Sequence, residues 1–156
     1  MTVEYKETGL KDMQRALIKL RQAVGQGRVE PMEKVGGEAI KIIISRTKDG
    51  RDVNGNKFTP YCDSYAKKKP GAPDLTLSGD MLKNIKFQAW TKKCRIYLAL
   101  GFDRVKGIVH NNRGRSGRGT GFAMPQREFM GVQKEVDKLR KIFRDWWEKY
   151  AKDLGL

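Results

Sequence analysis

The sequence predicts an α+β fold in a single domain of 156 residues. Three observations predict it: two helical apolar patterns in the first third of the chain, alternating apolar and polar residues in the middle, and a long apolar stripe at helical spacing near the end. We expect an N-terminal helix pair, a small antiparallel β-sheet, a long C-terminal amphipathic helix packed on the sheet, and two long mobile loops. A chain of this length can bury an ordinary core.

A helical hairpin is predicted over residues 8–47. The first helix has apolar residues at three- and four-residue steps, namely Leu10, Met13, Leu17, Leu20 and Val24. Such steps place them on one face of a helix. The second helix begins near Pro31, because proline is well tolerated in the first turn. Gly36 and Gly37 lie inside it and weaken it, so we expect another backbone to pack closely there.

Residues 48–76 are predicted to form a loop. Asn54-Gly55 is a turn-forming pair, since both residues adopt positive φ at low cost. Phe58 is an aromatic side chain that we expect to pin the loop to the core. The end of the loop is expected to be an exposed, mobile basic tip formed by Lys67, Lys68 and Lys69.

Residues 77–110 are predicted to hold a short helix and the sheet. The helix is expected around residues 80–84. Apolar and polar residues alternate from Ile85 onward and again from Ile96 to Leu100, with a turn at residues 92–93. This alternation is typical of half-buried strands. Residues 107–110 are expected to add a third short strand that ends at His110.

Residues 111–123 form a glycine-rich basic loop in the sequence. Arg113, Arg115 and Arg118 lie in it, with no acidic residue between residues 113 and 127. Arginine and glycine in this arrangement bind single-stranded or structured nucleic acid, but an acidic partner protein requires the same residues. The residues alone leave both partners open, and we treat the three arginines as a partner-binding loop.

Residues 124–156 are predicted to hold an anchor motif and the C-terminal helix. The apolar stripe of this helix comprises Val132, Val136, Leu139, Phe143, Trp146 and Tyr150. Their steps of three and four residues place them on one face. We expect this face to belong to the core, and a contact with a neighbouring subunit is the alternative.

The chain carries a large positive charge. Its 33 Lys and Arg against 18 Asp and Glu give a net charge of +15, which favours association with a polyanion or an acidic protein surface.

No run of 18 apolar residues occurs, so no membrane-spanning helix is expected. The first residues lack the pattern of a signal peptide. Cys62 and Cys94 have no metal-type spacing and are expected to be free thiols.

No catalytic constellation is predicted. His110 is the only histidine, so no second histidine completes a metal-nuclease pair. The acidic and amide residues between Asp49 and Asn56 lack the glycine position and the closing glutamate of a calcium-binding loop. We therefore expect no enzyme activity, no cofactor and no metal site.

Four short motifs follow one another between residues 50 and 131. They read GRDVNGNKFTP (50–60), LSGDMLKNI (77–85), VHNNRG (109–114) and MPQREFMG (124–131). In this order they resemble the phage virion-morphogenesis or tail-completion family, the head–tail joining or neck proteins of tailed bacteriophages. Phe58 stands where that family usually has Trp, and Glu128 stands where it usually has Pro.

The resemblance implies a virion protein without catalysis or cofactor. Such a subunit assembles in the host cytoplasm, usually as six copies, into a ring at the neck between capsid portal and tail. Its partners are then a head-side connector or adaptor ring and a tail terminator or tail-tube ring. Genomic DNA passes without specific contacts, and no membrane is involved. The alternative is a small basic nucleic-acid-binding protein that uses the Arg/Gly-rich loop.

The resemblance also implies structural roles at the anchor motif. Pro125 holds the chain extended. Arg127 donates hydrogen bonds to backbone carbonyls or an acidic side chain, and Phe129 is buried beside the sheet. The loop at residues 111–123 orders against neighbouring subunits during assembly.

Overall fold

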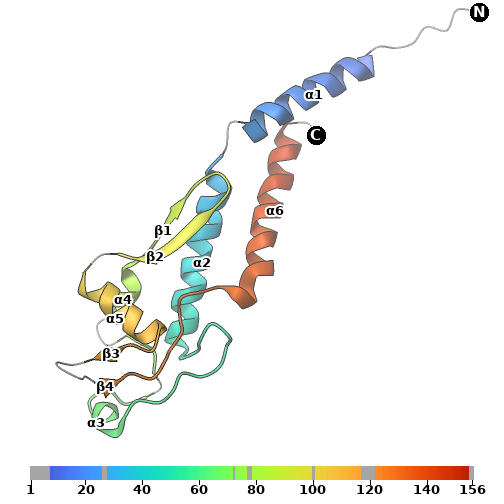
Figure 1. Cartoon of the computed structure of the whole chain (residues 1–156). Coiled ribbons are helices and arrows are strands. Elements are labelled where there is room, and N and C mark those ends of the chain that lie inside the picture. Colours follow the sequence, from blue (N-terminus) through green and yellow to red (C-terminus); the bar gives the residue numbers. More distant parts are fainter. Residues whose placement is uncertain are drawn as a thin grey trace, which may run out of the picture.

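The protein combines helices with a small antiparallel sheet, which confirms the predicted α+β class (Figure 1). The computed structural model describes residues 8–25, 28–71, 73–76, 79–99, 101–116 and 122–154. Its elements are α1 (Thr8–Gly25), α2 (Glu30–Lys48), α3 (Asp63–Ala66), α4 (Asp80–Lys83), β1 (Ile85–Ala89), β2 (Cys94–Leu98), α5 (Phe102–Asn111), β3 (Arg115–Ser116), β4 (Phe122–Ala123), η1 (Gln133–Glu135) and α6 (Val136–Asp153).

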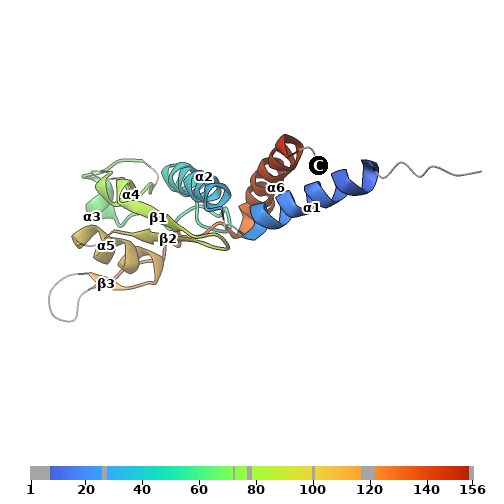
Figure 2. The ribbon, with the colours of Figure 1, turned by 90° about the horizontal axis from the view of Figure 1, so that it is seen from above.

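Helix α2 is the centre of the body. The β1–β2 hairpin packs on one side of it and α6 packs on the other (Figures 1 and 2). The expectation that the C-terminal helix packs on the sheet is therefore wrong, because α2 lies between them. The reason is that α2 buries residues toward both neighbours: Gly36 meets the sheet, whereas Arg46 reaches Glu135, the last residue of η1 before α6 begins.

The hairpin has the predicted first strand and turn, whereas the second strand begins two residues earlier than the predicted Ile96; the predicted end, Leu100, lies outside the described residues. Ile85 pairs with Leu98 and Ala89 pairs with Cys94 in an antiparallel register, and the Trp90 amide donates to the Lys93 carbonyl at the turn. The close approach expected at the paired glycines occurs at Gly36. It involves side chains rather than a backbone: a Cβ there would lie 2.6 Å from the Phe87 ring.

The core gathers side chains from the whole length of the body. Its buried members are Ile43, Phe58, Leu75, Met81, Leu82, Ile85 and Phe129. Phe58 belongs to this cluster, as expected for the aromatic side chain that pins residues 48–76 to the core, and Phe129 is fully buried. The stripe of α6 is only partly covered, because Leu139 is buried while Phe143 remains 38% exposed.

Two expected elements differ in the structure. Residues 107–110 are part of helix α5 rather than a third strand. Four residues are too few to separate the two periodicities, and the longer run of Phe102, Val105 and Val109 has helical spacing. The two N-terminal helices do form, but not as a hairpin: α1 projects away from the body instead of folding back along α2 (Figures 1 and 2).

The segment 48–76 is folded rather than a free loop. Arg51 and Lys57 form an isolated β-bridge, and Val53 is buried. The expected basic tip is only partly exposed, because Lys69 pairs with Asp74 and lies over the Tyr61 ring. Its neighbours Lys67 and Lys68 are exposed.

Candidate functional site

Arg127 joins three separate segments of the chain. Its side chain is 1% exposed. The Nε and Nη2 atoms donate to the Thr59 carbonyl at 3.1 and 2.9 Å, and Nη2 also donates to the Pro60 carbonyl at 3.1 Å. The Arg127 amide donates to the His110 carbonyl at 2.8 Å. Arg127 therefore makes the carbonyl contacts that an anchor requires, between residues 59–60 and the end of α5.

Of the neighbouring Arg127 and His110 side chains, only the guanidinium of Arg127 carries a positive charge at pH 7. Burial lowers the pKa of the Arg127 guanidinium, which nonetheless stays protonated at any physiological pH. Burial, and then the charge of Arg127, lower the pKa of His110, so this imidazole is neutral at pH 7. Among the described residues, Arg127 Nη1 and His110 Nδ1 have no hydrogen-bond partner.

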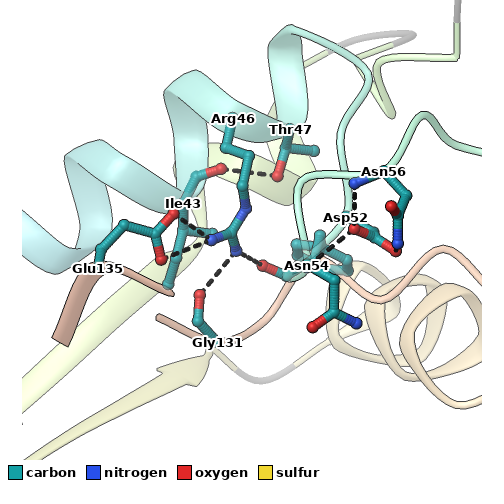
Figure 3. Close-up of polar contacts among 9 residues, drawn as sticks. Ile43, Arg46, Thr47, Asp52, Asn54, Asn56, Gly131 and Glu135 are labelled. Carbon is teal, nitrogen blue, oxygen red and sulfur yellow. Dashed lines mark hydrogen bonds and ion pairs between the residues drawn. The ribbon is translucent and has the colours of Figure 1, made fainter. Parts of the chain in front are cut away.

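A second buried arginine, Arg46 of α2, holds the other end of the anchor (Figure 3). Its Nη1 donates to both carboxylate oxygens of Glu135 at 2.9 and 3.0 Å. Its Nη2 donates to the carbonyls of Phe129 and Gly131 at 2.9 and 2.7 Å. Charge-assisted, two-pronged contacts of this kind fix geometry well. We define residues 127–131 as the anchor segment, which two arginines hold in place.

Reasoning from the sequence missed Arg46. A single arginine in an apolar helix is usually placed on the solvated side. The available signal was its position three residues after Ile43, on the buried face of α2, since residues three apart lie side by side on a helix.

The turn after α2, which Asp52 organises (Figure 3), is fastened to the anchor segment by one backbone hydrogen bond. Asp52 Oδ1 accepts hydrogen bonds from the amides of Asn54 and Asn56 at 2.8 and 2.7 Å. The intervening Val53 amide donates to the Glu128 carbonyl at 2.9 Å. The Asp52 carboxylate thus stabilises the turn by accepting hydrogen bonds from its backbone. In the part of the chain that the structure describes, no group of three His, Cys, Asp or Glu residues could hold a metal ion.

A cavity of about 910 Å³ lies beside the anchor segment. Its lining includes Tyr61, Cys62, Tyr65, Pro125 and Arg127. The half-buried Pro125 brings the chain from the basic loop into this wall. Cys62 is an exposed free thiol, and its hydrogen-bonding contact with Ser64 lowers its pKa. Burial raises the pKa of the other free cysteine, Cys94.

The basic loop starts and ends next to this cavity. Its ends pair as the two short strands β3 and β4, with Arg115 opposite Ala123. Arg113 and Arg115 are exposed, and Arg113 adopts a left-handed backbone with φ of 56°. Arg118 lies outside the described residues. Of the three arginines predicted to bind a partner, the structure thus describes two, and both are exposed.

Residues 8–146 match the phage virion morphogenesis family. The chain belongs to this family. No match was found among curated proteins or among solved structures. Within the described residues no helix is long and apolar enough to cross a membrane.

Family membership makes the protein a component of phage virion assembly. The matched region begins with α1 and ends within α6. It therefore includes the projecting helix α1, which lies before the stretch in which the motifs resemble the family. The anchor segment and both arginines that hold it also lie inside the matched region.

Proposed function

We propose that this protein is a structural subunit of the phage neck, forming a ring that completes the tail and joins it to the head. The observation that carries the proposal is the family match over residues 8–146. Large apolar side chains on the surface support it, since Phe102 is 87% exposed and Val105 is 59% exposed. Soluble monomers rarely present such patches, whereas assembly subunits require them.

In this role the anchor segment fixes the docking elements on the body. Residues 127–131 are held by Arg46 and Arg127, so the end of the basic loop is rigidly placed. The loop arginines Arg113, Arg115 and Arg118 then meet acidic surfaces of the adjacent rings, a head-side connector on one face and a tail terminator or tail tube on the other.

Deleting the gene from the phage tests the neck role. The expected result in negative-stain electron microscopy is full heads and separate tails, and a plasmid copy of the gene restores joined particles. Joined, infectious particles in the absence of the gene would contradict the proposal.

Nucleic-acid binding is the second candidate, because the net charge of +15 and the exposed Arg113 and Arg115 favour it. Its test is a salt titration of binding to short duplex and single strands. If the loop binds nucleic acid, changing Arg113, Arg115 and Arg118 to Ala weakens binding and reduces the salt slope by about 2–3.

The matched control for that titration removes the same charge elsewhere. The lysines at 67, 68 and 92 are exposed, and changing all three to Ala leaves the loop intact. Equal losses in the two triple variants would assign the binding to overall charge rather than to the loop.

A further inference from the structure

We propose that helix α1 of one copy seats on the exposed apolar face of α5 in the next copy, and that this contact links the ring. Two surfaces are involved. The α1 stripe is formed by Met13, Leu17 and Ile18, and the α5 face is formed by Phe102, Val105 and Ile108. The proposal rests on the proposed ring and names the surface by which one subunit binds another.

Among the described residues, the α1 stripe is left about half exposed. Met13, Leu17 and Ile18 are 56%, 54% and 56% exposed, and the helix projects from the body in both views (Figures 1 and 2). An isolated helix of this length is marginal in water, because most helical stability in proteins comes from packing an apolar face. Helix α1 therefore needs a surface outside the body to which it belongs.

The α5 face is an apolar surface with a fixed support. Phe102, Val105 and Ile108 are 87%, 59% and 47% exposed. The opposite side of α5 is held on the body, where Gly107 packs against Leu98 and Phe129.

A hollow of about 480 Å³ borders this face. Its lining includes Tyr97, Leu98, Ile108 and Met130. Polar side chains such as Gln88, Arg95 and Arg104 complete the lining, so the hollow beside the apolar α5 face is mixed and leaves room for protruding side chains.

The two surfaces lie at opposite ends of the molecule, as both views agree (Figures 1 and 2). Two different surfaces placed in this way join copies head to tail, and a head-to-tail contact closes into a ring when the rotation between copies permits. The size is suitable too. An 18-residue helix is about 27 Å long, close to the breadth of a standard interface patch of about 800 Å². A second copy of this chain is thus the occupant that fits.

The test uses the full-length chain and native mass spectrometry with sedimentation velocity. Leu17→Lys disrupts the α1 stripe, and Phe102→Lys disrupts the α5 face. Both positions are exposed in the free subunit, so both variants should keep the wild-type circular dichroism spectrum and melting temperature. Each variant alone is expected to self-associate at least about 100-fold more weakly than the wild type, because a charge would be buried without a partner.

Mixing the two variants decides the arrangement. The Phe102→Lys copy has an intact α1 stripe and the Leu17→Lys copy has an intact α5 face, so an equimolar mixture should form a one-to-one heterodimer and stop there. Phe143→Lys is the matched control, since Phe143 is an exposed apolar residue of α6 in neither surface, and it should assemble like the wild type.

Several results would overturn the contact. They are wild-type chain that stays monomeric at its highest soluble concentration, single variants that assemble normally, a mixture without heterodimer, or loss of assembly only in Phe143→Lys. Variants that still form rings would reject the contact and leave the neck role intact. Joined particles without the gene would reject the neck role and leave the contact intact.

Discussion

At the scale of residues, the body depends on two buried arginines that bind backbone carbonyls. Arg127 bonds to residues 59 and 60, and Arg46 bonds to residues 129 and 131 and to Glu135. Segments far apart in sequence are thus held by side chains rather than by a large sheet. Buried charges of this kind are costly when a partner is removed, because the remaining groups lose both water and their bond.

Changing Arg46 to Ala should lower the free energy of unfolding by about 3–5 kcal/mol, since it leaves Glu135 and two carbonyls without their donor. Urea denaturation followed by circular dichroism measures the change. Arg140→Ala is the control, because Arg140 and Asp137 form an ion pair that is exposed to solvent. This change should lower the free energy of unfolding by less than about 0.5 kcal/mol. Equal losses would contradict the structural role of Arg46.

His110 should make stability fall as the solution becomes mildly acidic. Burial and Arg127 lower its pKa in the folded protein, whereas the unfolded chain keeps a pKa of about 6.5. Below that pH the unfolded state binds more protons, so the free energy of unfolding decreases, by at most about 1.4 kcal/mol per pH unit for one group. Urea midpoints between about pH 6.5 and pH 5 test this. His110→Asn should remove the slope, and an unchanged slope would reject the assignment.

At the scale of elements, the sequence predicted well where a periodic pattern was long. The helices at 8–25 and 30–48 and the strand from Ile85 follow their patterns, and the second strand is shifted by two residues. Residues 107–110 were too few to distinguish a strand from α5. The packing of α6 could not be read from its stripe, since an apolar face fits a helix as well as a sheet. Arg46 was missed because its acceptors, two backbone carbonyls and the distant Glu135, lie more than 80 residues away in the sequence.

Gly36 and Gly37 should respond in opposite ways to alanine. At Gly36 a Cβ would lie 2.6 Å from Phe87 and 2.7 Å from the Cys94 sulfur, so Gly36→Ala should destabilise by about 1–3 kcal/mol. At Gly37 nothing lies within 4 Å of a Cβ, so Gly37→Ala should stabilise by up to about 1 kcal/mol. Melting temperatures of the two variants decide this, and a stabilised Gly36→Ala would mean that α2 sits further from the sheet.

At the scale of the whole molecule, the positive charge and the apolar surfaces act against each other. The exposed Arg21 lies one helical turn from Leu17 in the α1 stripe, and the exposed Arg95 and Arg104 line the hollow beside Ile108 of the α5 face. Copies that meet through these surfaces bring like charges together, and salt screens that repulsion. Binding to nucleic acid has the opposite salt dependence, because the free energy gained by releasing counterions from the nucleic acid falls as the salt concentration rises.

Self-association should therefore strengthen as salt rises from about 0.05 to 0.3 M, while any binding to nucleic acid weakens. Sedimentation velocity at several salt concentrations measures the first, and fluorescence anisotropy with a labelled oligonucleotide measures the second. Sodium chloride and potassium glutamate should give the same direction if screening is the cause. Self-association that weakens with salt would instead indicate contacts between opposite charges.

The projecting helix α1 also allows limited proteolysis to distinguish free subunits from assembled ones. Its exposed Arg15, Lys19 and Arg21 are cleavage points for trypsin, and a helix without tertiary support opens often enough to be cut. In free subunits α1 should thus be the first segment that trypsin digests, whereas the proposed contact with α5 of a neighbouring copy would shield it. The rate at which α1 is lost would then report how many of the proposed contacts have formed, and an incomplete ring would leave one α1 helix unprotected.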